Sequence, residues 1–319
     1  MKILVTGAVG FIGSHLCQRL LSLGHELVGV DNFDPYYDPT VKAQNAGLLR
    51  DHSGFILHRV DIRDDFEMEK IFHDHRFELV IHLAAKAGVR PSILHAPEYM
   101  SVNIDGLTRL LERSRSNGVR RFLFASSSSV YGNQHKIPFS ESDPVDFPIS
   151  PYAASKRSGE LLCHVYHHLY HMEVACLRLF TVYGPRQRPD LAIHKFIGLA
   201  LQNTPIDLYG DGSSRRDYTY VSDIVNGFER LAFHPQLGFE IFNIGNGQPV
   251  KLLDLVQALE RVLNRNIALR FIDKQAGDVD QTFADISKAR QYLGYQPMVG
   301  LDEGVKSFVD WYMDSDQKS

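Results

Sequence analysis

The first thirty residues constrain the fold most, because they set a strand, a glycine-rich turn, a helix and a second strand in that order. The apolar run Lys2–Thr6 has the length and composition of a buried strand. A helix is expected from about Phe11, after three glycines at every third position, Gly7, Gly10 and Gly13. A second apolar run, Glu26–Val30, ends at Asp31. Such a unit predicts parallel strands with a helix between them.

The glycine turn also indicates a binding site for a dinucleotide. Glycines let the backbone at a helix N-terminus come close to a pyrophosphate. The spacing is GxxGxxG, whereas GxGxxG is commoner, but strand, turn, helix, strand and terminal acid stand in the order of the dinucleotide fingerprint. Asp31 would accept hydrogen bonds from an adenosine ribose and repel a 2′-phosphate, which favours NAD over NADP; alternatively it only caps a turn. The expected cofactor contacts here are Gly7, Gly10, Phe11, Ile12, Gly13, Asp31 and Asn32.

Strands and helices continue to alternate along the first half of the chain. Strands are expected at Phe55–Val60, Leu79–His82 and Phe122–Ala125, and a long helix at residues 95–117. This alternation predicts an α/β fold with a doubly wound, Rossmann-like parallel sheet and a site at the carboxyl ends of the strands. Those ends and the long helix add further candidate cofactor contacts, namely Asp61, Ile62, Leu83, Ala84, Ala85 and Asn103.

A second motif points to acid–base chemistry. Ser150 can cap a helix and Pro151 suits its first position, so Tyr152 and Lys156, four residues apart, share one face. A neighbouring cation and a helix N-terminus both favour the phenolate, which would make Tyr152 a general base for a sugar or alcohol hydroxyl. A serine from the run 126–129 could hydrogen-bond a substrate oxygen or pass a proton to Tyr152. The alternatives are a solvated helix face and a serine-rich loop.

Composition limits the class of protein. A chain of 319 residues with 44% hydrophobic residues and a net charge of −4 suits a globular enzyme of one large or two intimate domains. The charge is too small and mixed to indicate nucleic acid or an anionic membrane as partner, and no run is apolar enough to span a bilayer. The three cysteines lie far apart, so free thiols in a reducing cytoplasm are expected.

A histidine cluster could suggest a metal site. His164, His167, His168 and His171 have helical spacing, but no carboxylate or cysteine array completes a ligand shell. A polar face or a subunit contact is the expected role, and no metal is predicted.

Together these motifs resemble the extended short-chain dehydrogenase/reductase family, in its nucleotide-sugar epimerase branch, over essentially the whole chain. The resemblance rests on TGAVGFIG at 6–13, DN at 31–32, DIRD at 61–64, HLAA at 82–85, SSSSVYG at 126–132, SPYAASK at 150–156 and RRDYTYVSD at 215–223. It implies that Ser127 and Tyr152 are catalytic and that Lys156 binds the nicotinamide ribose and tunes Tyr152. It also implies a tightly bound NAD, regenerated in each turnover, a UDP-sugar substrate and a homodimer formed through the Tyr152 helix and its neighbour at about 95–117.

Two short segments distinguish the branches of this family. The 4,6-dehydratases carry Asp-Glu where this chain has Ser128 and Ser129, and the uronate decarboxylases usually keep a Glu at the second place. The missing carboxylates favour an epimerase. The segment TVYGPRQRPD at 181–190 resembles UDP-glucuronate 4-epimerases. An arginine fork and a hydroxyl can bind both oxygens of a uronate, and Arg188 with Thr181 is the expected pair, ahead of Arg186. Two solvated loop arginines are the alternative.

The resemblance assigns the remaining substrate contacts. Arg216 matches the arginine on the nucleotide diphosphate, and Asp278 matches a carboxylate at the uridine ribose, although Gln275 stands where some relatives have a phosphate-binding arginine. Ser127 and Ser128 are also expected to contact the sugar. We expect the NAD-binding domain at 1–179 and 222–247 and a smaller substrate domain at 180–221 and 248–319.

The expected reaction is the 4-epimerisation of UDP-glucuronate to UDP-galacturonate through a 4-keto intermediate. The alternatives are a 4-epimerase for UDP-glucose/galactose or N-acetylhexosamines, a UDP-uronate decarboxylase, and a non-catalytic NAD-binding regulator.

Overall fold

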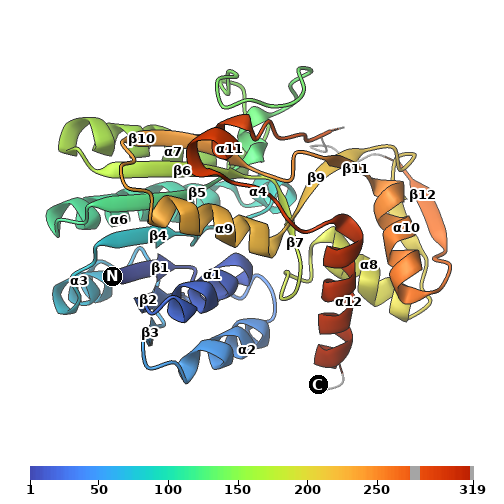
Figure 1. Ribbon diagram of the computed structural model, residues 1–319, viewed down its shortest axis with the longest axis horizontal. Helices are drawn as coiled ribbons and strands as arrows, with labels where there is room; N and C mark the ends of the chain where they lie inside the picture. Colours follow the sequence, from blue (N-terminus) through green and yellow to red (C-terminus); the bar gives the residue numbers. More distant parts are fainter. Residues whose placement is uncertain (274–280, 317–319) are drawn as a thin grey trace.

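A seven-stranded sheet forms the centre of the computed structural model, which describes residues 1–273 and 281–316. The strand order is β10-β6-β5-β4-β1-β2-β3, and every neighbouring pair is parallel (Figure 1). The strands are β1 (Lys2–Thr6), β2 (Glu26–Val30), β3 (Phe55–His58), β4 (Leu79–His82), β5 (Arg121–Ser127), β6 (Glu173–Leu179) and β10 (Phe239–Ile244). The predicted doubly wound fold is confirmed, and its strand order reverses between β1 and β4, where such sheets open a crevice.

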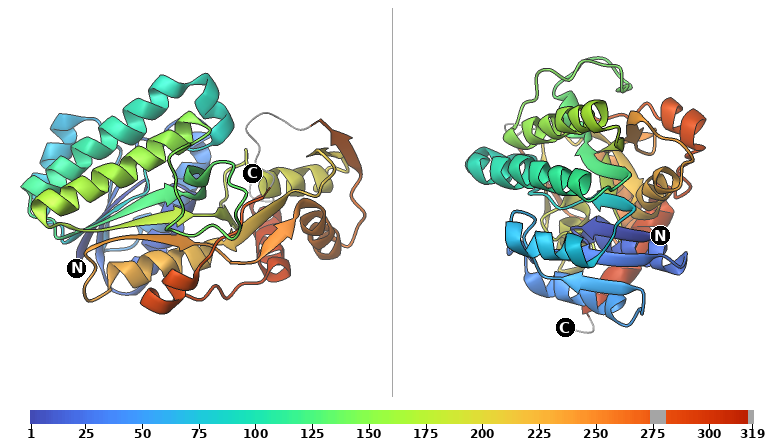
Figure 2. Two further views of the ribbon diagram at one scale, coloured as in Figure 1. Left: turned by 90° about the horizontal axis from the view of Figure 1, so that it is seen from above. Right: turned by 90° about the vertical axis from the view of Figure 1, so that its left-hand side faces the viewer.

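Helices cover both faces of this sheet, because neighbouring strand residues point to opposite sides. Ile3 and Val5 of β1 lie in one apolar core, whereas Leu4 lies in the other. The first core contains residues of α1 (Phe11–Ser22), α2 (Pro39–Arg50) and α9 (Val221–Ala232); the second contains residues of α3 (Asp65–Asp74), α6 (Gly106–Ser116) and α7 (Pro151–Tyr170). Figure 2 shows these layers end-on.

A smaller part of the chain adjoins the sheet at the carboxyl ends of its strands, on the right in Figure 1. It holds a three-stranded sheet in the order β11-β9-β7 and a two-stranded sheet of β12 and β8. Three helices pack around a third apolar core. The elements are β7 (Thr181–Tyr183), α8 (Ala192–Leu201), β8 (Ile206–Tyr209), β9 (Arg215–Tyr220), β11 (Pro249–Lys251), α10 (Leu252–Leu263), β12 (Leu269–Ile272) and α12 (Leu301–Asp316).

The two parts interleave along the chain. After β9, α9 packs beside α1 and β10 joins the large sheet next to β6, so this segment returns to the sheet as expected. Residues of α11 (Ser287–Leu293) and Tyr295 lie in the first core of the large sheet. The described residues of the stretch 248–319 therefore contribute to both parts, and the expected domain boundaries stay a prediction.

The helix expected at residues 95–117 is interrupted. It consists of α5 (Ala96–Met100), a π-helical turn at Ser101–Asp105, and α6. The wider turn contains Asn103, whose amide oxygen accepts a hydrogen bond from the Lys86 amide at 2.8 Å and whose Nδ2 donates to the Lys86 carbonyl at 3.0 Å. Because such turns insert one residue without ending a helix, apolar periodicity does not reveal them.

Candidate active site

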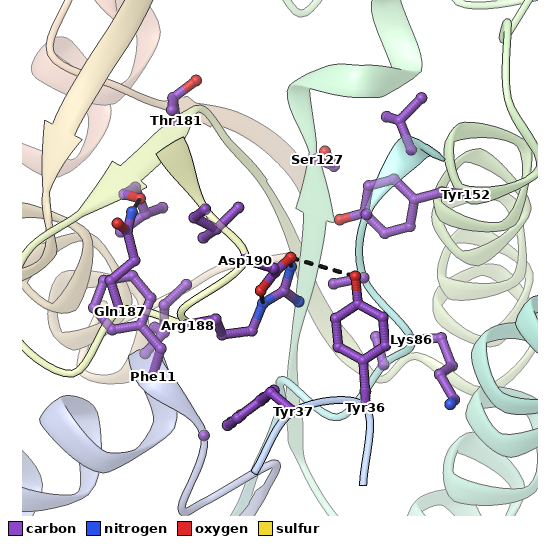
Figure 3. A pocket seen from close by; sticks show the side chains of 18 of the residues that line it. Phe11, Tyr36, Tyr37, Lys86, Ser127, Tyr152, Thr181, Gln187, Arg188 and Asp190 are labelled. Atoms are coloured by element: carbon purple, nitrogen blue, oxygen red, sulfur yellow. Dashed lines mark hydrogen bonds and ion pairs between the residues drawn. The ribbon is translucent and has the colours of Figure 1, made fainter. Parts of the chain in front are cut away.

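One large cavity of about 930 Å³ lies at the carboxyl ends of β1, β4 and β5 and extends into the smaller part (Figure 3). Most of the residues expected to bind cofactor or substrate line it together. They are Gly7, Gly10, Phe11, Ile12, Gly13, Asp31, Asn32, Asp61, Ile62, Leu83, Ala84, Ala85, Ser127, Tyr152, Lys156, Thr181, Arg188 and Arg216.

The glycine turn after β1 fits a pyrophosphate. Gly7 has a φ of +70°, and a Cβ on it would lie 2.8 Å from the Ala84 amide nitrogen. A Cβ on Gly13 would collide with the Gly7 carbonyl oxygen. No side chain in the described part of the chain caps α1, whose first residues line the cavity. The amides at this helix start are thus available to an anion.

The acids after β2 and β3 suit a ribose and an adenine. Asp31 is buried, and its Oδ1 accepts hydrogen bonds from Lys42 Nζ at 2.9 Å and from the Phe33 amide at 2.8 Å. The Arg63 side chain, bonded to Asp61, lowers the pKa of that carboxyl to about 2. Asp61 is therefore an ionised acceptor at neutral pH. Lys42 also lines the cavity and was not predicted, because a lysine inside a helix carries no motif.

The expected catalytic residues converge from two elements. The Ser150 hydroxyl accepts a hydrogen bond from the Ala153 amide at 3.1 Å, and Pro151 is the first residue of α7, so the predicted cap is confirmed. Lys156 Nζ donates to the Ala125 carbonyl at 2.7 Å and lies 5.9 Å from the centre of the Tyr152 ring. Burial lowers the pKa of Lys156 to about 8. Ser127, the last residue of β5, shares the cavity with Tyr152.

The pKa of Tyr152 is raised in the free protein, not lowered as the Tyr–Lys pairing suggests. Burial raises it, whereas the nearby Ser127 hydroxyl and the positive charge of Arg188 act in the opposite direction. The cation that assists Tyr152 here is Arg188, since Lys156 is bonded to the β5 backbone. The phenol is thus protonated before a ligand binds.

A buried ion pair fixes the elements that carry these residues. Glu160 lies on α7, four residues after Lys156, and accepts hydrogen bonds from Arg178 Nε at 2.8 Å and Nη2 at 2.9 Å. The Ser126 hydroxyl donates to the same carboxylate at 2.7 Å. These bonds join α7, β6 and β5. The sequence carries one signal of this network, which is a charged residue, Glu160, on the apolar face of the helix.

The two candidate arginines of the 181–190 loop point in different directions. Arg188 lies in the cavity, where its Nε and Nη2 donate to Asp190 at 3.0 and 2.9 Å. Arg186 is buried with a φ of +65°, and its guanidinium donates to His15 and to Gln18 of α1. Of the two, Arg188 is the one available to a ligand.

Two predicted site residues, Asn103 and Ser128, lie elsewhere. Asn103 is buried behind the Lys86 loop and Ser128 begins a short 3₁₀ turn; neither lines the cavity. Asn103 therefore positions the loop after β4 from behind. Asp278 lies outside the described residues, as does Gln275.

The part of the cavity that extends into the smaller part of the chain is rich in cations. Arg216, Arg270, Lys195 and Arg90 line it, with the Arg90 guanidinium 4.8 Å from the centre of the Tyr209 ring. Next to Arg216, the fully buried Asp217 accepts hydrogen bonds from the amides of 246 and 247 at 2.7 and 3.0 Å and thereby anchors β9. Cations in the cavity wall, one of them over an aromatic ring, suit an anionic nucleotide.

The histidine cluster has structural contacts. His167 Nδ1 bonds to the Met172 carbonyl at 2.8 Å, and His164 packs against Phe239. Among the described residues, no group of three or more potential ligands is arranged to hold a metal ion. Across the same residues we also found no helix with the length and apolar character needed to cross a membrane.

Comparison with known proteins agrees with this site. The model of the NAD dependent epimerase/dehydratase family matches residues 3–245. The UDP-glucuronate 4-epimerase of Thermodesulfobacterium geofontis is 40% identical over 309 residues, 97% of this chain and 95% of that protein.

Two solved structures cover nearly the whole chain. That of the UDP-glucuronic acid 4-epimerase of Bacillus cereus with UDP-glucuronic acid and NAD has a TM-score of 0.93 and 39% identity, and the match covers 99% of this chain and 100% of that one. The UDP-glucose 4-epimerase of Thermotoga maritima with UDP-glucose has a TM-score of 0.91 and 33% identity, with 99% of both chains covered. Backbone similarity therefore does not separate the two sugars.

Proposed function

The chain belongs to the NAD dependent epimerase/dehydratase family, and on this basis we propose that it is an isomerase that interconverts UDP-glucuronate and UDP-galacturonate at C4. One observation carries the choice of sugar. Arg188 lies in the same cavity as Tyr152, close enough for its charge to offset part of the rise in the pKa of the phenol. A guanidinium fork beside the general base suits a substrate that carries a carboxylate next to the reacting carbon.

The residues of the chain divide the proton chemistry among them. NAD, when bound, supplies the acceptor and donor of the C4 hydride, so that no net redox change occurs. Tyr152, which acts as the base in its phenolate form, takes the proton of the C4 hydroxyl and returns it after the sugar has turned. Ser127, which lines the same cavity as Tyr152, holds that hydroxyl oxygen. Lys156, fixed on the Ala125 carbonyl in the free protein, is assigned to the nicotinamide ribose.

The glucuronate intermediate needs protection. Oxidation at C4 produces a β-keto acid, which loses CO₂ most readily when its carboxylate stands perpendicular to the ketone plane. We assign Arg188 and Thr181, both in the cavity wall, to holding the carboxylate near that plane. Residues 128 and 129 are serines, so no carboxylate stands there to drive elimination.

A product assay tests the proposal. Purified protein without added NAD is incubated separately with UDP-glucuronate and UDP-glucose, and the products are resolved by NMR. We expect UDP-galacturonate from the first substrate. A UDP-pentose with CO₂ would instead identify a decarboxylase, and conversion of UDP-glucose alone would identify an epimerase of neutral sugars.

We further propose a homodimer that works in the reducing cytoplasm. Three apolar residues at four-residue spacing on α7, Leu161, Val165 and Leu169, are 51, 44 and 56% exposed and form a stripe that a second α7 could cover. All three cysteines are unpaired, which supports the reducing cytoplasm as the compartment. Light scattering after gel filtration tests the assembly, since Val165→Glu with Leu169→Glu should convert a dimer to a monomer.

A further inference from the structure

We propose that Asp190 competes with the carboxylate of the substrate for Arg188; this inference rests on the proposed function. In the free protein, Asp190 occupies the face of Arg188 that a uronate would use. It would lower the affinity of the enzyme for uronates, substrate and product alike, and leave the affinity for neutral sugars unchanged.

The geometry of the pair supports this role. Arg188 donates from Nε to Asp190 Oδ1 at 3.0 Å and from Nη2 to Oδ2 at 2.9 Å. These two nitrogens form one of the two sides of the guanidinium that can bind a carboxylate with two parallel hydrogen bonds. A uronate can take that side only if Asp190 leaves it.

Asp190 can leave at low cost. Its side chain is 33% exposed, so water can solvate it, whereas Arg188 is 16% exposed. The Tyr36 hydroxyl, from the loop after β2, donates to Asp190 Oδ2 at 3.3 Å, and the Arg188 guanidinium lies 5.3 Å from the Tyr36 ring centre (Figure 3). Once Arg188 has turned to the sugar, Asp190 keeps the Tyr36 hydroxyl and water as partners, so no buried carboxylate is left unpaired.

The exchange of carboxylates on Arg188 can occur with a charged sugar but not with a neutral one. A uronate replaces one carboxylate on Arg188 by another, and the departing product returns Arg188 to Asp190. A neutral hexose brings no charge that could replace Asp190, so the pair stays intact when it binds. Asp190 therefore acts on the uronate alone.

The test is a binding comparison in the NAD-loaded Tyr152→Phe protein, in which turnover does not disturb the titration. We expect Asp190→Asn to tighten UDP-glucuronate binding roughly two- to fivefold, the range of a partly exposed ion pair, with UDP-glucose binding unchanged. Asp34→Asn is the matched control. Asp34 lines the same cavity but pairs with Lys86 at 3.0 Å, so this variant removes an equal charge without freeing Arg188. It should shift UDP-glucuronate relative to UDP-glucose less than Asp190→Asn does.

Three results would overturn the inference. Weaker uronate binding in Asp190→Asn would mean that Asp190 holds Arg188 in place for the substrate. A gain in preference for UDP-glucuronate no larger than that of Asp34→Asn would reduce the effect to general charge, and no change would remove the competition. Asp190→Ser repeats the test if the Asn variant does not fold. Failure of every variant and of the parent to bind UDP-glucuronate would reject the proposed function itself.

Discussion

Replacing Lys156 by Met should stabilise the free protein while it impairs the reaction. Lys156 is 4% exposed, and burial lowers its pKa from 10.5 to about 8. At about 1.4 kcal/mol per pKa unit, holding the charged form costs the folded state about 3 kcal/mol near neutral pH. Met matches the length of the side chain and carries no charge. It cannot donate to the Ala125 carbonyl, and the loss of that bond costs about 1 kcal/mol.

The pH dependence separates these two contributions. Between the folded pKa of about 8 and the unfolded value of 10.5, the unfolded chain binds more protons at Lys156, so wild-type stability rises with pH there. Below about pH 8 the penalty is fully present, and above 10.5 it is gone. The stability advantage of Lys156→Met over wild type should therefore shrink by about 2 kcal/mol between about pH 7 and pH 10.

Urea unfolding of both proteins, freed of bound nucleotide, measures this difference. Other groups titrate in the same range, but they are common to both proteins and cancel. An advantage of Lys156→Met that is independent of pH would refute the reasoning, because it would show that the lysine is buried without an electrostatic cost.

Three further changes test the site. Tyr152→Phe should lower kcat for UDP-glucuronate at least ~10²-fold, because the sole base is lost, and a mild effect would move the role elsewhere. Arg188→Ala should lose most epimerase activity on UDP-glucuronate, with Arg188→Lys recovering only part of it, since a lysine lacks the fork; turnover like that of wild type in Arg188→Ala would discard the carboxylate assignment. Glu160→Ala should destabilise the fold by about 3–5 kcal/mol by leaving Arg178 buried and unpaired, and Glu160→Leu with Arg178→Met should restore most of that stability in urea unfolding.

The fold was predictable because its signals are local. The β1 run, the glycine turn and Asp31 belong to one continuous segment, and each follows from strand composition or from the space around a backbone. Alternating strands and helices then determine a parallel sheet with a site at the carboxyl ends of its strands. Ser150 and Pro151 likewise define the start of α7 from adjacent residues alone.

The remaining features depend on contacts between distant residues. Lys42 reaches Asp31 across a loop, and Glu160 meets Arg178 from another element. Arg186 and Arg188 are two residues apart in one loop, yet a positive φ at Arg186 directs its side chain to α1. No spacing rule distinguishes these two arginines, because the backbone conformation of a single residue decides between them.

The pKa of Tyr152 shows the same limit at the level of chemistry. From the sequence, a cation four residues away on a helix suggests a lowered pKa, since charge and spacing are visible and burial is not. In the structure both groups are buried, and burial opposes the phenolate and the ammonium alike. Lys156 is bound to Ala125, and the opposing effects come from Ser127 and Arg188, which lie on other segments. Because Arg188 is itself paired with Asp190, its effect on Tyr152 depends on which carboxylate it holds. The base and the carboxylate-binding residue therefore have to be considered as one electrostatic unit.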